Sequence, residues 1–261
     1  MPSEQPRNQA KLPIVHTRRE GHILYISMQR EAKRNAIDRE MADGIDAALN
    51  QLEDDDSLWV GILSGTDSIF CAGSDLTCDG DYNTERGGEY GIIRRVRRKP
   101  LVAAVEGPAL GGGLEIVLSC DLVVASRKAR FGLPEVSIGV IPTCAALFRA
   151  PNALPLNLAR ELILTGEPIG AERAHSAGLV NHLTEPGETL SQATKLAERI
   201  LQNAPLSVQN CLSAVNQYTA QTEDIGWRLT GEAFEGIRNS EDIKEGVTSF
   251  LEKRPPRWKA R

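Results

Sequence analysis

Apolar residues along this chain of 261 residues follow two spacings that predict different elements. Short runs rich in Ile, Val and Leu are typical of buried strands. Such runs predict strands at 23–28, 59–63, 101–105 and 122–125. After Asp38, a possible N-cap, apolar side chains recur at the spacing of one helical face. They are Met41, Ile45, Ala48, Leu49 and Leu52.

Strands that alternate with helices predict an α/β fold whose strands pair largely in parallel. A short helix is expected at 112–119, between the last two strands. Beyond about residue 142 the pattern becomes almost entirely helical, with stretches expected at 190–201, from 206, from 224 and at 241–251. We therefore expect a flexible N-terminal tail at 1–13, a core at 14–195 and a C-terminal helical region at 196–261.

The composition narrows the class of protein. The 30 Lys and Arg against 35 Asp and Glu give a net charge of -5, which disfavours a dedicated binder of nucleic acid or of an anionic membrane surface. No apolar run approaches the roughly 20 residues that cross a bilayer. The first residues have no apolar signal-peptide core, and the five cysteines form no CxxC pair. We expect free thiols and a cytoplasmic location.

A run of basic residues at 94–99 stands out in this acidic chain. Such a run most often forms a solvated face or the end of a helix. A less common role is a subunit contact, or the steering of an anionic ligand toward its site.

Three segments carry residues suited to chemistry, at 70–76, 107–115 and 131–135. In the second, Gly111-Gly112-Gly113 follow a predicted strand and open a helix, so their backbone N–H groups would be unobstructed. Such a turn could bind a phosphate or an oxyanion that forms during a reaction, or it could be a tight turn required only for packing. The phosphate-binding patterns GxxxxGK with Ser or Thr and GxGxxG are both missing.

Glu115 and Glu135 are the candidate acid and base. Glu115 lies in an apolar stretch, where a buried carboxylate is costly unless it is paired or functional, and Glu135 follows Pro134. Two carboxylates beside such turns suit general acid–base work, although either could instead face solvent. The four histidines have no metal-ligand spacing, and no GxSxG nucleophile motif is present. We therefore expect no metal site.

The motifs resemble, in content and order, those of the enoyl-CoA hydratase/isomerase (crotonase) family. They are A-G-x-D-L at 72–76, P-A-L-G-G-G-x-E at 108–115, C-D-L-V-V-A at 120–125, F-G-x-P-E at 131–135 and G-x-x-P at 139–142. The resemblance covers nearly the whole chain from about residue 14 onward. It implies a crotonase-like spiral of ββα units and a C-terminal helical region that builds trimers, often paired into hexamers.

The resemblance also implies an active site. Backbone N–H groups of Ser74 and Gly112 would form an oxyanion hole for the thioester oxygen. Glu115 and Glu135 would hold one water between them, one activating it for attack at C3 and the other helping to deliver a proton to C2. Coenzyme A enters as the thioester substrate, so no metal or redox cofactor is implied. Because isomerases of the family often lack one glutamate, the presence of both favours an enoyl-CoA hydratase.

The resemblance also implies which residues contact the acyl-CoA, by their positions in the family motifs. Lys33–Ala36 and Ala72–Leu76 would line the coenzyme A groove. Phe250 and Lys253 would complete the nucleotide site, within one chain or from a neighbouring subunit, unless they are only a core aromatic and a surface lysine. The expected substrate contacts are Lys33, Arg34, Ala36, Ala72, Asp75, Leu76, Gly111, Pro134, Thr143, Phe250 and Lys253.

Some features depart from the common family pattern. Residues 143–146 (Thr-Cys-Ala-Ala) stand where many hydratases have a glycine-rich stretch that borders the acyl pocket, so the pocket should be narrowed or reshaped. Thr77 stands where some relatives have a coenzyme-binding lysine. The ending at 240–259 is similar to the carnitinyl-CoA dehydratase branch. The alternative reactions are therefore dehydration of a carnitinyl-CoA thioester, double-bond isomerisation, C–C bond cleavage and thioester hydrolysis. A further alternative is a non-catalytic or RNA-binding relative.

Overall fold

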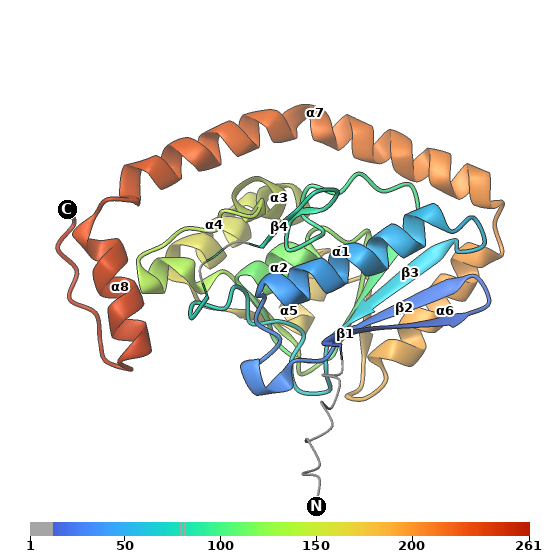
Figure 1. The fold of residues 1–261 in the computed structure, drawn as a ribbon, viewed down its shortest axis with the longest axis horizontal. Coiled ribbons are helices and arrows are strands. Elements are labelled where there is room, and N and C mark those ends of the chain that lie inside the picture. Colours follow the sequence, from blue (N-terminus) through green and yellow to red (C-terminus); the bar gives the residue numbers. More distant parts are fainter. Residues whose placement is uncertain (1–12, 79, 81) are drawn as a thin grey trace, which may run out of the picture.

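A six-stranded sheet is the framework of the protein in the computed structural model, which describes residues 13–78, 80 and 82–261 (Figure 1). Its strands, in spatial order, are β1 (Val15–Glu20), β2 (Ile23–Met28), β3 (Val60–Ser64), β6 (Leu101–Val105), β8 (Leu122–Ser126) and β11 (His182–Thr184). β1 pairs with β2 antiparallel, and every other neighbouring pair is parallel. The predicted α/β fold is confirmed, whereas the expected tail at 1–13 lies almost entirely outside the described residues.

A smaller sheet sets the geometry of the site. Its strands are β10 (Ile169–Gly170), β9 (Arg130–Gly132) and β7 (Ala109–Leu110). β7 and β9 pair in parallel, so the chain leaves both strands at the same edge of the sheet. The glycine-rich turn follows β7 and the Pro134 turn follows β9. The two segments that carry the candidate carboxylates are thus brought to one place. β4 (Asn83–Thr84) and β5 (Gly88–Glu89) form a separate antiparallel pair.

Helices cover both faces of the large sheet. Successive side chains of a strand point to opposite faces, so Ile26 of β2 shares a core with α1 (Arg39–Asp54) while Tyr25 packs with α6 (Thr189–Leu201). Asp38 caps α1 as predicted, because its carboxylate accepts a hydrogen bond from a backbone N–H of the first turn. The buried stripe of α1 is the one predicted from its apolar spacing.

The C-terminal part is helical. α7 (Pro205–Ile237) is one continuous helix of 33 residues, where the sequence predicted two stretches, and it arches over the molecule (Figure 1). α8 (Glu241–Leu251) matches its prediction and is capped by Ser240. The expected boundary at 195/196 falls inside α6, which packs on the large sheet, so the division into two regions stays a prediction. Across the described ranges, no helix combines the length and the apolar character needed to cross a membrane.

Shorter helices connect these parts. They are η1 (Glu31–Lys33), α2 (Gly112–Val117), η2 (Pro134–Ile138), α3 (Ala146–Ala153), α4 (Leu156–Thr165) and α5 (Ala171–Ser176). α2 ends two residues before the predicted end of its helix at 119. α2 and η2 carry the two candidate carboxylates, Glu115 and Glu135.

The basic run at 94–99 is largely folded into the protein. Lys99 is 2% exposed, and its Nζ donates to two carbonyl oxygens at the C-terminal end of α1, both at 2.8 Å. The buried guanidinium of Arg97 is bonded to Asp121, and the side chain of Arg95 is ion-paired with a residue of α1. The prediction of a solvated face is therefore wrong for these three residues, because each meets an acceptor that is distant in the sequence.

Candidate active site

The glycine-rich turn aims α2 into the protein. Gly111, which precedes the helix, has φ +55° and ψ −125°, a conformation that residues with a Cβ rarely adopt. Its N–H donates to the carbonyl of Gly132 at 2.9 Å, which ties the turn to β9. α2 begins at Gly112, and all six of its residues are buried, including Glu115 in the first turn.

Glu115 is buried and held by backbone donors. Glu115 is 2% exposed, so its side chain does not face solvent. Oε1 accepts hydrogen bonds from the N–H groups of Cys144 at 2.8 Å and Ala146 at 3.0 Å. Burial raises the pKa of Glu115 to about 7, although the two backbone bonds lower it. The carboxyl group can therefore change its charge near neutral pH.

Glu135 reaches the same turn from η2. Its Oε1 lies 3.1 Å from the position that a Cβ would take on Gly111, directly beside the start of the helix that carries Glu115. Its Oε2 is buried and has no hydrogen-bond partner within the described part of the chain. Burial, and next the charge of Glu115, raise the pKa of Glu135 to about 8. The charge of Glu115 thus disfavours the ionisation of Glu135.

Ser74 and Gly112 lie side by side in two adjoining segments. Cys71 forms a parallel bridge with Ala109, which joins the two segments that carry Ser74 and Gly112. The segments are so close that a Cβ on Gly73 would lie 3.0 Å from the nitrogen of Gly112. Neither the N–H of Ser74 nor that of Gly112 donates a hydrogen bond to any described residue. Two unused donors therefore sit beside the glycine turn.

Tyr90 is a site residue that the sequence did not single out, whereas Cys144 was noted only as part of the 143–146 segment that replaces a glycine-rich stretch. The Tyr90 hydroxyl lies 2.7 Å from Oγ of Ser74, and its ring packs on Gly112. Cys144 is buried and donates its N–H to Glu115. Tyr90 lies in a polar stretch with no recognisable motif, and its left-handed backbone, with φ +57°, is visible only in the structure.

The two segments expected to line the coenzyme A groove do lie together. The N–H of Ala72 donates to the carbonyl of Arg34 at 3.1 Å. Ile37, next to Ala36, exchanges backbone hydrogen bonds with the 73–75 turn. Lys33 and Leu76 are solvent-exposed on these segments. Their side chains are thus available to a ligand, whereas the role itself stays a prediction.

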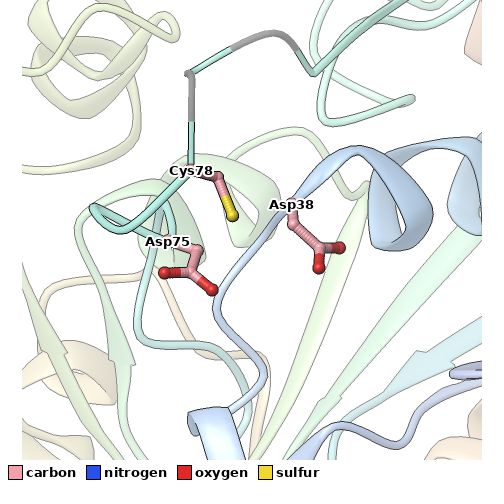
Figure 2. A group of neighbouring side chains, drawn as sticks. All are labelled: Asp38, Asp75 and Cys78. Atoms are coloured by element: carbon pink, nitrogen blue, oxygen red, sulfur yellow. The ribbon is translucent and has the colours of Figure 1, made fainter.

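Asp75 belongs to an ion-pair network rather than to open solvent. Asp75, Asp38 and Cys78 come within metal-ligand spacing of one another (Figure 2). Arg30 lies between the carboxylates, 2.8 Å from Asp38 and 2.9 Å from Asp75. Burial alone would raise the pKa of Asp75, but hydrogen bonds from Thr77 and Arg30 outweigh it and hold the pKa at about 2. The guanidinium already supplies the positive charge that this cluster needs.

The remaining expected substrate contacts fall into two groups, one near the two glutamates and one at the end of α8. Gly111 and Pro134 border Glu135, and Thr143 is exposed on the loop that binds Glu115. Phe250, 55% exposed, and Lys253 lie at the end of α8. Among the interactions of the described residues, no hydrogen bond or ion pair joins either of them to the 33–36 or 72–76 segments. Their role at the nucleotide site stays a prediction.

Comparisons with known proteins show the family of this chain. Residues 18–261 match the profile of the family described as enoyl-CoA hydratase/isomerase. The chain is 35% identical over 252 residues to the short-chain-enoyl-CoA hydratase of Clostridium acetobutylicum, covering 94% of this chain and 97% of that protein. It is 34% identical over 258 residues to a carnitinyl-CoA dehydratase of Salmonella arizonae, covering 92% and 96%. The crystal structure of a carnitinyl-CoA hydratase from Mycobacterium avium matches with a TM-score of 0.91 and 37% identity, covering 96% of this chain and 100% of that one.

Proposed function

The chain belongs to the enoyl-CoA hydratase/isomerase family, and we propose that it catalyses the reversible addition of water to the 2,3 double bond of an enoyl-CoA thioester. The family predicted from the sequence motifs is confirmed. The single observation that carries the hydratase proposal is the position of Glu135. Its Oε1 lies beside Gly111, at the start of the helix that carries Glu115, and its Oε2 has no partner among the described residues. A water or a substrate oxygen would satisfy that oxygen.

Hydration requires one carboxyl group to act as a base and the other as an acid, and the raised pKa values support these two roles. Because each carboxyl group is buried and the charge of Glu115 disfavours ionisation of Glu135, the pair tends to keep one proton near neutral pH. The ionised member would take a proton from the water that attacks C3. The protonated member would supply the proton that C2 receives. The roles are a property of the pair.

The unused N–H groups of Ser74 and Gly112 support a site for the thioester oxygen. As water adds at C3, negative charge moves onto this oxygen, and donors already in place stabilise it without reorganising. Each donor would lower the barrier by about 3–4 kcal/mol. The thioester itself makes C2 acidic, so the proposed reaction requires no metal and no redox cofactor.

We also propose that the protein forms a trimer or a dimer of trimers and that it is cytoplasmic, each on separate grounds. α7 exposes apolar side chains that a second copy would cover in a trimer or a dimer of trimers: Leu206, Val215, Tyr218, Ile225 and Leu229. Such an assembly would let Phe250 and Lys253 complete the nucleotide site of a neighbour. Light scattering on the purified protein measures the subunit number. Five free cysteines suit a reducing compartment, which supports a cytoplasmic location.

Hydration of crotonyl-CoA tests the proposal, since adding water removes the ultraviolet absorbance of the conjugated double bond. Glu115→Gln and Glu135→Gln should each lower kcat by about 10²–10⁴-fold while binding of the thioester persists. Glu106→Gln is the matched control, because Glu106 is a buried glutamate that bonds Gly187 and Thr189 outside the site. Near-normal hydration by either site variant would overturn the assignment of that residue.

A second candidate is dehydration of a carnitinyl-CoA thioester. The specific observation in its favour is the similarity to carnitinyl-CoA dehydratases and hydratases over nearly the whole chain. The same pair of carboxyl groups would serve, because dehydration is the reverse of water addition. A panel of straight, branched and polar acyl-CoA thioesters, compared by kcat/KM, decides between the two. A preference for crotonyl-CoA over carnitinyl-CoA would reject the second candidate.

A further inference from the structure

Tyr90 holds a backbone conformation that is unusual for a large side chain. Its φ of +57° lies in the left-handed region, where an aromatic residue is an outlier. The residue is 3% exposed, and its N–H donates to the carbonyl of Tyr82 at 3.0 Å, just after β5. Strained backbone persists only where the surroundings enforce it, and such residues concentrate at functional sites.

The hydroxyl end of Tyr90 contacts both residues that carry the proposed oxyanion donors. It is 2.7 Å from Oγ of Ser74. A Cβ on Gly112 would lie 2.6 Å from the same hydroxyl, so the ring occupies the space that any larger residue at 112 would need. One side chain therefore contacts both residues whose N–H groups are proposed to bind the thioester oxygen.

The same hydroxyl also neighbours the loop that binds Glu115. Burial raises the pKa of Tyr90 well above its ordinary value, and the nearby Cys144 and Glu115 raise it further. Tyr90 consequently keeps its proton at neutral pH and acts as a hydrogen-bonding group. Cys144 is the residue whose N–H donates to Oε1 of Glu115 at 2.8 Å.

We infer that Tyr90 is a positioning residue: its hydroxyl fixes the Ser74 turn and the ring fixes Gly112, so that the two N–H donors stay aligned beside Glu115. This inference rests on the proposed hydration at the same site. It assigns Tyr90 no contact with the reacting atoms. The hydrogen bond to Ser74 is the contact through which the hydroxyl acts.

Tyr90→Phe is the direct test, because it keeps the ring and removes only the hydroxyl. We expect kcat for crotonyl-CoA hydration to fall about five- to tenfold, the effect of one lost hydrogen bond, with KM little changed. A slowly reacting, chromophoric enoyl-CoA gives an independent readout, since aligned donors polarise the bound thioester and shift its absorbance to longer wavelength. The variant should show a smaller shift.

Tyr25→Phe is the matched control. Tyr25 is also a buried tyrosine, and its hydroxyl lies 3.2 Å from Oγ1 of Thr194 on the other face of the large sheet. Its loss should leave both kcat and the absorbance shift unchanged. Ser74→Ala removes the same hydrogen bond from the other side, and the double variant with Tyr90→Phe should lose no more than either single one.

Two outcomes separate this inference from the proposed function. If the unaltered protein hydrates crotonyl-CoA and Tyr90→Phe matches it in kcat and in absorbance shift, the inference is wrong and the hydratase proposal stands. If the unaltered protein hydrates no enoyl-CoA, the proposed function fails. The absorbance shift of the bound chromophore then still tests the alignment of the donors, and an equal shift in both proteins rejects it.

Discussion

Oε1 of Glu135 packs directly against Gly111, 3.1 Å from the position that a Cβ at residue 111 would take. The contact joins two parallel strands, because Gly111 follows β7 and Glu135 follows β9. It also explains why a residue without a Cβ is needed at the start of α2.

Gly111→Ala should damage both stability and hydration. The added methyl group would meet the carboxylate, and the backbone at φ +55° would be strained in any residue with a Cβ. We expect the free energy of unfolding to fall by about 1–3 kcal/mol in urea titrations. We also expect kcat for hydration to fall, since Glu135 must move.

Gly170→Ala is the control for that change. Gly170 has an ordinary φ of −76°, and open space surrounds its Cβ position. Its substitution should alter the free energy of unfolding by less than about 0.5 kcal/mol and leave hydration intact. Equal behaviour of the two variants would contradict the role given to Gly111.

The pH dependence of hydration should report the coupled pair. With pKa values of about 7 for Glu115 and about 8 for Glu135, the singly protonated pair is most abundant near neutral pH. We expect a bell-shaped plot of kcat/KM against pH, with both flanks above the ordinary glutamate value, because kcat/KM reports the ionisation of the free enzyme. Steady-state assays from about pH 5 to about pH 10 measure it. A plot that bends only near the ordinary pKa of a glutamate would speak against the pair.

The raised pKa of Glu135 should make the folded protein less stable as pH rises. Since the folded protein holds the proton of Glu135 more tightly than the unfolded chain, the stability gained from this proton is complete below the unfolded value and is lost as pH rises through about 8. Glu135→Gln removes this loss. Between pH 5 and pH 9, its free energy of unfolding should therefore rise relative to that of the unaltered protein by about 4 kcal/mol.

Glu106→Gln should show the opposite trend. Burial alone would raise the pKa of Glu106, but hydrogen bonds from Thr189 and Gly187 and the nearby Lys128 lower it. Glu106 therefore stabilises the fold in its charged form, and this stability is complete above its unfolded pKa. The variant should lose stability relative to the unaltered protein as pH rises through the acid range up to the ordinary glutamate pKa. Parallel denaturant titrations of the two variants compare the signs. The same sign for both would disagree with the environments seen here.

Ala145 should tolerate glycine better than its neighbour does. Ala145 and Ala146 are both buried, so Ala→Gly removes a buried methyl group at either position, at a cost of about 0.8 kcal/mol. Only Ala145 has a left-handed backbone, with φ +83°, and glycine relieves about 1–2 kcal/mol of strain there. Thermal or urea unfolding should rank Ala145→Gly as the more stable variant by roughly that amount. If Ala146→Gly were equally stable, the strain at 145 would be absent.

Much of the fold was predictable from local patterns. β2, β6 and α8 begin and end where the apolar spacing places them, and the Asp38 cap forms as expected. These features depend on residues that are close in the sequence. α7 is one continuous helix where the sequence predicted two stretches, and the described helix has no proline after its first residue.

The amino-acid sequence by itself determined the alternating strands and helices, the family motifs, and the presence of two glutamates beside turn-forming residues. The tertiary structure decided which side chains meet: Glu135 with the turn of Glu115, Lys99 with the end of α1, and Tyr90 with Ser74. Local spacing specifies which face of an element is apolar, but burial and pairing of polar groups depend on partners that only folding brings together.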